Sequence, residues 1–125
     1  MEIINFADTP SLVSRYMLEL RDVDIQRDRL RFRRNLERIG QIMAYEISKR
    51  LDYKNVPTET PLGVSTCQTA ADPVVIATLL RAGLPLHQGF LDYFDNAENA
   101  FVSAYRKYRQ KEGDKFDVLI EYLAS

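Results

Sequence analysis

Hydrophobic residues recur at helical spacing through the first part of the chain, from about residue 9 to residue 51. Thr9-Pro10 predicts an N-cap followed by proline at the first helical position. Asp24 predicts the start of a second helix, because its carboxylate can accept hydrogen bonds from the free amides of a first turn. An apolar stripe with steps of three and four residues then predicts one long amphipathic helix. Its members are Phe32, Leu36, Ile39, Met43, Ile47 and Leu51.

The pattern changes to short runs of β-branched residues between residues 52 and 71, where Pro57, Pro61 and Gly63 interrupt the chain. Such runs on either side of Pro-Leu-Gly predict a β-hairpin arm, and proline restricts that arm to exposed edges. The arm divides the chain into a helical segment (residues 1–51), the arm itself (52–71) and a third part (72–125).

The third part has the pattern of an α/β protein. The continuous apolar run 74–80 predicts a strand covered on both faces. Gly83 then begins a short predicted helix over 84–94, whose inward residues are expected to be Leu86, Phe90, Leu91 and Phe94. Residues 100–105 predict a second strand, and the helix-length connection makes the two strands parallel.

A polar turn at residues 110–114 follows the second strand, and residues 116–122 alternate between apolar and polar side chains. This alternation predicts that the chain turns back as a β-hairpin extending from the second strand.

Composition narrows the function classes. The 125 residues are 46% hydrophobic and 28% charged with a net charge of −1, which excludes a disordered chain and a globally cationic nucleic-acid binder. One cysteine, Cys67, allows no intrachain disulfide and no multi-cysteine zinc site. No apolar stretch is long enough to cross a membrane, and the N-terminus lacks a secretory pattern. We therefore expect a soluble cytoplasmic protein.

Three other features have ordinary structural interpretations. His87 is the only histidine, so we expect packing or a helix surface rather than a metal ligand or general base. Cys67 has no nearby base and is expected to be inert. The basic segment is interleaved with acidic residues, which favours a solvated or interface face over RNA binding. Its arginines are Arg21, Arg27, Arg29, Arg31, Arg33, Arg34 and Arg38. We find no catalytic acid–base residue and no metal cluster.

Two arginines stand where an α/β sheet binds ligands, at the carboxyl ends of its strands. Arg81 follows the first strand and Arg106 ends the second, so parallel neighbours would place both guanidinium groups on one rim. Arginine suits phosphate oxygens, and Gly83 would let backbone amides approach the same anion. The residues thus favour a phosphorylated ligand, while two ordinary surface arginines stay an alternative.

The residues around these arginines resemble a known family. Leu79-Leu80-Arg81-Ala82-Gly83-Leu84 is similar to the Ile-Leu-Arg-Ala-Gly-Leu segment of uracil phosphoribosyltransferases, and Tyr105-Arg106 lies where that family has Met-Tyr-Arg. Phe32-Arg33, Tyr45-Glu46 and Thr60-Pro61-Leu62-Gly63 match the family's N-terminal helix and arm, so the resemblance covers nearly the whole chain.

The resemblance implies an α/β fold, with N-terminal helices, a β-arm and the first half of a type I phosphoribosyltransferase-like parallel sheet bearing a β-hairpin flap. It implies transfer of the phosphoribosyl group from 5-phosphoribosyl 1-diphosphate (PRPP) to uracil in pyrimidine salvage, giving UMP and diphosphate. Arg81 and Arg106 would bind PRPP, with Ala82, Gly83 and Tyr105 as supporting residues. Mg²⁺ bound with PRPP, a GTP effector, an effector or interface role for Arg33 and a homodimer or higher oligomer are further implications.

Two segments of the family are missing from these 125 residues: the acidic strand end with its Thr-Gly-Gly turn, and the glycine-rich segment that holds uracil. We therefore expect the uracil site and the 5-phosphate site to lie beyond Ser125, and the chain to be inactive alone. The alternative is a non-catalytic binding or regulatory module that retains part of the fold. Because a parallel sheet needs further cover, we also expect the chain by itself to oligomerise, to be disordered near its C-terminus or to be poorly soluble.

Overall fold

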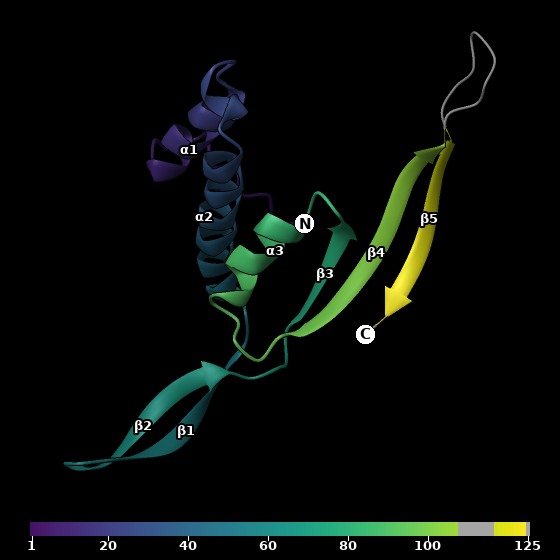
Figure 1. Cartoon of the computed structure of the whole chain (residues 1–125). Helices are drawn as coiled ribbons and strands as arrows, with labels where there is room; N and C mark the ends of the chain where they lie inside the picture. The colour runs from purple at the N-terminus through teal and green to yellow at the C-terminus, as the bar shows by residue number, and fades with distance from the viewer. Residues whose placement is uncertain (108–116, 125) are drawn as a thin grey trace, which may run out of the picture.

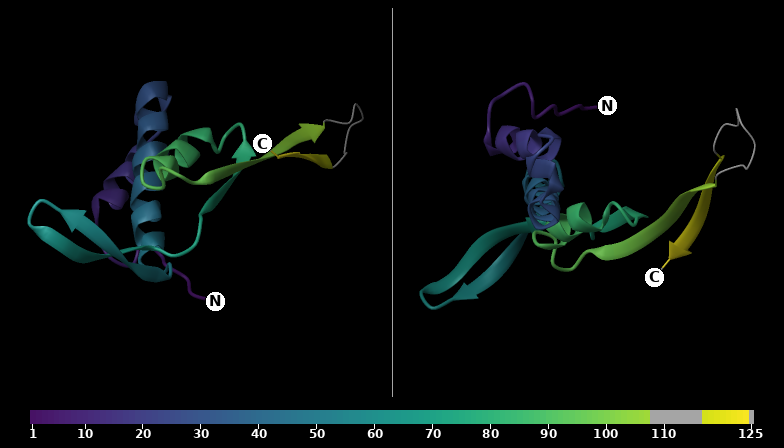
Figure 2. Two further views of the ribbon diagram at one scale, coloured as in Figure 1. Left: turned by 90° about the horizontal axis from the view of Figure 1, so that it is seen from below. Right: turned by 45° about the horizontal axis from the view of Figure 1, so that its top comes forward.

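The computed structural model describes residues 1–107 and 117–124. The β1–β2 arm and the β4–β5 hairpin project to opposite sides of a central helix, α2 (Figures 1 and 2). The elements in chain order are α1 (Leu12–Arg21), the short 3₁₀ helix η1 (Ile25–Arg27), α2 (Arg29–Ser48), β1 (Tyr53–Thr60), β2 (Gly63–Ala70), β3 (Val75–Leu80), α3 (Leu84–Leu91), β4 (Glu98–Lys107) and β5 (Asp117–Ala124).

Both predicted helix starts are displaced. The first helix begins after Ser11 rather than Thr9, because the Ser11 hydroxyl accepts from the Val13 amide while its own amide donates to the Ser14 hydroxyl. This reciprocal capping satisfies two groups that a helix end leaves unpaired. The long helix begins after Asp28, whose carboxylate accepts from the Arg31 amide, whereas Asp24 precedes only η1.

The buried face of α2 differs from the predicted apolar stripe. Its buried residues are Asn35, Ile39, Gly40 and Ala44. Two members of the stripe, Phe32 and Ile47, are 38% and 40% exposed. The reason is that α3 crosses α2 at its small residues, and a close helix crossing is decided by side-chain size rather than by hydrophobicity alone.

The hairpin arm is confirmed. Strands β1 and β2 pair antiparallel from Tyr53 opposite Ala70 to Thr60 opposite Gly63, so the turn falls at the predicted Pro61-Leu62. Gly63 has φ of 125°, a conformation that favours glycine. Among the described helices and strands, the two arm strands pack only on each other.

The second sheet has the order β3-β4-β5, with β3 parallel to β4 and β4 antiparallel to β5. The predicted parallel pair with a helical connection and the predicted hairpin are therefore confirmed, while the turn at residues 110–114 lies outside the described residues. The prediction that β3 is covered on both faces is wrong for the described chain. Ile76 and Thr78 are buried beneath α3, but the alternating residues Val75 and Leu79 are 59% and 56% exposed.

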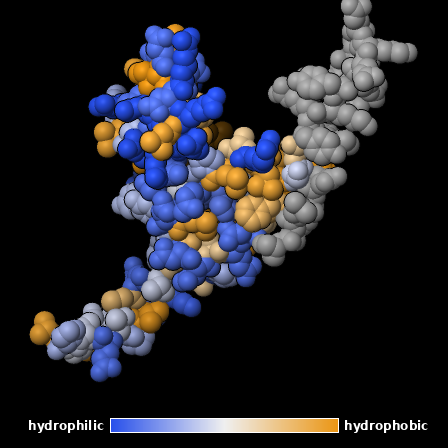
Figure 3. Space-filling model, viewed as in Figure 1, coloured by the Kyte–Doolittle hydropathy of each residue, from blue (hydrophilic) through white to orange (hydrophobic). Residues whose placement is uncertain are grey.

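Exposed apolar side chains gather where α3 and β3 meet, while the surface over α1 and the first turns of α2 is mostly polar (Figure 3). Over the part of the chain that the structure describes, no helix is long and apolar enough to cross a membrane.

Candidate functional site

The turn Arg81-Ala82-Gly83 joins the carboxyl end of β3 to the amino end of α3. Arg81 and Ala82 are exposed, and Arg81 forms no ion pair with any described residue. The peptide bond between Leu80 and Arg81 is cis. A guanidinium group that faces water without a carboxylate partner retains its full capacity for an anionic ligand.

Gly83 closes this turn against the strand. Its amide donates to the Leu79 carbonyl at 3.0 Å, and its carbonyl accepts from the His87 amide at 2.9 Å. A Cβ at this position would lie 2.7 Å from the Leu79 oxygen and 2.9 Å from the Thr78 methyl group. Gly83 therefore lets the turn pack on the strand, and its own amide is already used within the turn rather than offered to an anion.

The register of the sheet places the second candidate arginine at the same end. Leu80, the last residue of β3, is level with Ser103, and Arg81 follows it directly. Arg106 stands three residues, or about 10 Å, beyond Ser103 along β4. Within the hairpin Arg106 is paired with Val118, and Tyr105 with Leu119. The backbone thus brings Arg81, Tyr105 and Arg106 to one end of the sheet.

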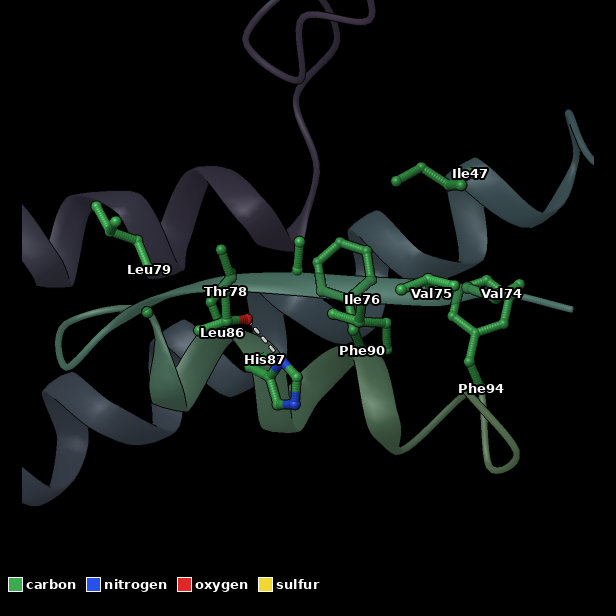
Figure 4. Close-up of a pocket in the computed structure, with 12 residues that line it drawn as sticks. Ile47, Val74, Val75, Ile76, Thr78, Leu79, Leu86, His87, Phe90 and Phe94 are labelled. Atoms are coloured by element: carbon green, nitrogen blue, oxygen red, sulfur yellow. Dashed lines mark hydrogen bonds between the residues drawn. The ribbon is translucent and has the colours of Figure 1, made fainter. Parts of the chain in front are cut away.

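A buried polar pair lies beneath the turn, and the sequence pattern points to only one of its members, His87. Thr78 and His87 are 7% and 6% exposed, and the Thr78 hydroxyl is hydrogen-bonded to His87 Nδ1 at 2.5 Å (Figure 4). His87 also contacts the Phe101 ring, with centroids 5.4 Å apart. The predicted packing role of His87 is confirmed. The sequence feature that could have pointed to Thr78 is its hydroxyl group within an otherwise apolar strand, three residues before Arg81.

A cavity of about 430 Å³ lies between β3, α3 and the end of α2 (Figure 4). Its lining is apolar apart from Thr78 and His87, and Arg81 is not among the lining residues. An anion would lose its hydration there without a cation to compensate, so this cavity is not the anion site.

Three of the seven arginines of the basic segment contact side chains of the N-terminal helical segment. Arg31 lies near Glu19 and Asp28, Arg34 pairs with Glu37 at 2.7 Å, and Arg38 lies over the Tyr16 ring. These contacts favour the predicted structural role. Arg29 and Arg33 are exposed and line a small cavity of about 280 Å³ with Gln26 and Phe32.

Cys67 is a free thiol on the exposed arm. Within residues 1–107 and 117–124, no three His, Cys, Asp or Glu side chains form a group that could hold a metal ion.

Fold and site together define an α/β protein with two candidate arginines, Arg81 and Arg106, at the carboxyl ends of two parallel strands. The Aquifex aeolicus protein AQ2163, a solved structure, shares this fold with a TM-score of 0.72 at 20% identity, over 91% of this chain and 52% of that one.

Sequence comparison gives the family. The family model described as uracil phosphoribosyltransferase matches residues 8–118. A uracil phosphoribosyltransferase of Porphyromonas gingivalis is 57% identical over all 125 residues, which span 57% of that relative. One of Pyrococcus furiosus is 35% identical over 123 residues, covering 97% of this chain and 50% of the relative. The chain belongs to the uracil phosphoribosyltransferase family, and it spans about half the length of these curated relatives.

Proposed function

We propose that this chain supplies the PRPP-binding part of a cytoplasmic enzyme of pyrimidine salvage that transfers the phosphoribosyl group from PRPP to uracil. The observation that carries the proposal is the exposed Arg81 turn at the end of a parallel strand, in a chain of the uracil phosphoribosyltransferase family. Arg81 and Arg106 are the proposed contacts to the diphosphate of PRPP, and Ala82, Gly83 and Tyr105 shape the backbone around it.

In the proposed reaction a bond forms between N1 of uracil and C1 of the ribosyl group. The bond from that carbon to a diphosphate oxygen breaks, and diphosphate leaves with the electron pair, giving UMP after N1 loses its proton. Negative charge grows on the leaving group as the ribosyl carbon becomes cationic. Fixed guanidinium groups lower this barrier because they attract the transition state more strongly than the ground state. No described side chain is assigned as a proton acceptor.

The β4–β5 hairpin is the proposed flap, whose closure would exclude water from this rim. We propose that Mg²⁺ arrives bound to PRPP, as the family resemblance implies. GTP as an effector stays a prediction from the family resemblance, as does the role of Arg33 at an effector site or interface.

Turnover is proposed to require more of the family's length than these 125 residues. Two observations support this: the chain spans 57% and 50% of the two curated relatives, and β3 has an unpaired edge within the described sheet. Binding of PRPP without turnover by the complete gene product would favour the non-catalytic module instead.

Substitution of the two arginines tests the assignment in the complete protein. Arg81→Ala and Arg106→Ala should each weaken PRPP binding, measured by calorimetry, by about tenfold or more, because each removes a charge-assisted contact. Arg29→Ala is the matched control, since it removes an exposed arginine from the helical segment and should leave the affinity within about twofold. Wild-type affinity in both test variants would refute the proposed site.

A homodimer or higher oligomer is the second proposal, with the arm as the contact. It is supported by the arm's isolation from the other described elements and by the exposure of its tip, where Leu62 is fully exposed and Val64 is 75% exposed. Contact with a second copy would remove these two apolar side chains from water.

Polar substitution of the arm tip tests the oligomer. Leu62→Ser with Val64→Thr should shift the protein toward the monomer in light scattering, because both side chains lose apolar contact area. Glu59→Gln on the same arm should not. A wild-type protein that is monomeric at micromolar concentration would contradict the proposal directly.

A further inference from the structure

The hydrogen bond between Thr78 and His87 stands in an otherwise apolar layer between β3 and α3. Ile76 precedes Thr78 on the buried face of the strand, and the Phe101 ring lies against the imidazole. Two apolar side chains of similar shape would fill this layer without burying polar groups, and such replacements are often neutral or stabilising. The polar pair therefore indicates a role beyond filling the core.

Both members of the pair contact the residue that closes the candidate turn. The Thr78 methyl group faces Gly83 so closely that a Cβ there would approach it to 2.9 Å, while the Thr78 hydroxyl bonds the imidazole. The His87 amide in turn donates to the Gly83 carbonyl at 2.9 Å. Gly83 is thus held from the strand side and from the helix side by two residues that are bonded to each other.

This arrangement is directional in a way that apolar packing is not. The hydrogen bond is satisfied only when the first turn of α3 stands at one height along β3, because its strength depends on distance and angle. Slippage of the helix would leave a buried hydroxyl and a buried ring nitrogen unpaired, which is costly. Arg81 lies in the short turn between β3 and α3. The position of α3 along β3 therefore also determines the position of the Arg81 backbone, from which the guanidinium group extends.

We propose that Thr78 and His87 are positioning residues for PRPP binding: their buried hydrogen bond holds the Arg81-Ala82-Gly83 turn where Arg81 meets the diphosphate. The inference rests on the proposed function. Neither side chain touches substrate in this proposal. Their effect reaches the ligand through Gly83 and the backbone of the turn.

The experiment uses the complete protein and compares Thr78→Val with Thr78→Ser. Valine keeps the shape and removes the hydroxyl, whereas serine keeps the hydroxyl and removes the methyl group. Thr78→Val should raise the KM for PRPP by about tenfold or more, because a displaced binding group loses most of its contact, and should leave the KM for uracil within about twofold. Thr78→Ser should raise the KM for PRPP less than Thr78→Val does.

His87→Asn provides the rescue. The asparagine side-chain amide reaches about as far as Nδ1, so it can restore the bond to Thr78, whereas His87→Phe cannot. We expect a KM for PRPP near the wild-type value in the first variant and a rise comparable to that of Thr78→Val in the second. Ile76→Val is the matched control for core damage, since it should lower Tm without changing the KM for PRPP.

Failure of the proposed function and failure of the positioning role give different results. A wild-type protein that neither binds PRPP nor forms UMP would overturn the proposed function first. A wild-type protein that does both, with Thr78→Val lowering Tm and leaving the KM for PRPP within twofold, would overturn only the positioning role.

The double variant Thr78→Val/His87→Phe guards against unfolding, because it fills the layer with apolar groups. Wild-type Tm with weakened diphosphate binding, measured by calorimetry, would support the inference, and wild-type diphosphate affinity would refute it. If none of these variants folds, amide hydrogen exchange on the wild-type protein decides. Exchange of the Gly83 amide as fast as that of exposed turns would contradict the proposal, and protection equal to β3 would support it.

Discussion

Glu19 on α1 is a buried carboxylate, 8% exposed, that joins the two N-terminal helices. It accepts hydrogen bonds from the side chains of Asn35 at 2.8 Å, Arg15 at 3.3 Å and Arg31 at 3.4 Å. These donors favour the ionised form, the Asn35 amide most strongly, and lower the pKa of Glu19 below its ordinary value of 4.5 against the opposing effect of burial. The ionised carboxylate therefore stabilises the folded protein.

The lowered pKa predicts a loss of stability in acid. The ionised Glu19 carboxylate makes its full contribution to the free energy of unfolding above the ordinary pKa of 4.5. This contribution is lost as the pH falls through the lower pKa of the folded protein. Glu19→Gln should therefore unfold at lower urea concentration than the wild type at neutral pH, and the difference should shrink below about pH 4. Glu59→Gln is the control, since Glu59 is exposed on the arm and forms no ion pair with any described residue. A difference that stays constant from neutral pH to about pH 3 would contradict this account.

Two glycines set the distance between α2 and α3. A Cβ on Gly89 would lie 2.1 Å from the Glu37 carbonyl oxygen, and one on Gly40 would lie 2.5 Å from the Leu86 carbonyl oxygen. Both neighbours are backbone atoms, which cannot rotate away as a side chain can. The helices touch here through their main chains, and the crossing also determines how α3 lies over β3.

Gly89→Ala is expected to separate these helices and to lower the free energy of unfolding by about 3 kcal/mol, the upper part of the usual cost of overpacking. Urea denaturation measures the change. Gly63→Ala is a useful comparison, because no atom lies within 4 Å of its Cβ position and only its φ of 125° opposes the substitution. It should cost about 1 kcal/mol. Equal losses in the two variants would show that the close approach at Gly89 is not the cause.

At the scale of the whole molecule, α3 covers one face of β3, and β3 is an unpaired edge among the described strands of the sheet. Figure 4 shows Leu79 pointing to the opposite side of β3 from His87. Parallel sheets are ordinarily buried on both faces, so Val75 and Leu79 present apolar surface that favours contact with further protein.

Val75→Thr with Leu79→Gln should therefore act differently in two contexts. In the 125-residue chain these changes should reduce self-association in light scattering, because they remove exposed apolar surface. In the complete gene product they should lower Tm, because the same positions would be covered there. An unchanged Tm in the complete protein would contradict that cover.

The sequence alone predicts the order and type of the elements in the third part and in the arm. The β-branched runs around Pro61-Leu62-Gly63 and the apolar run before Arg81 are local signals, and local propensity decides whether a segment is a strand. The parallel pairing of β3 with β4 also follows, since a helix-length connection leaves little choice. The end of the sheet that carries Arg81 and Arg106 was therefore predictable from residue order.

Other features were decided by tertiary structure. Ser11 and Asp28, rather than Thr9 and Asp24, cap the two helices. Several side chains compete for the same free amides, and only the folded geometry selects among them. The buried face of α2 follows from the place where α3 crosses it.

The contact of Thr78 with Gly83 and His87 likewise joins groups from two elements, and no spacing along the chain encodes it. Sequence pattern determines what each segment of this protein becomes, because periodicity and capping are local. Only tertiary packing determines which side chains support Arg81, because that depends on the height of one helix along one strand.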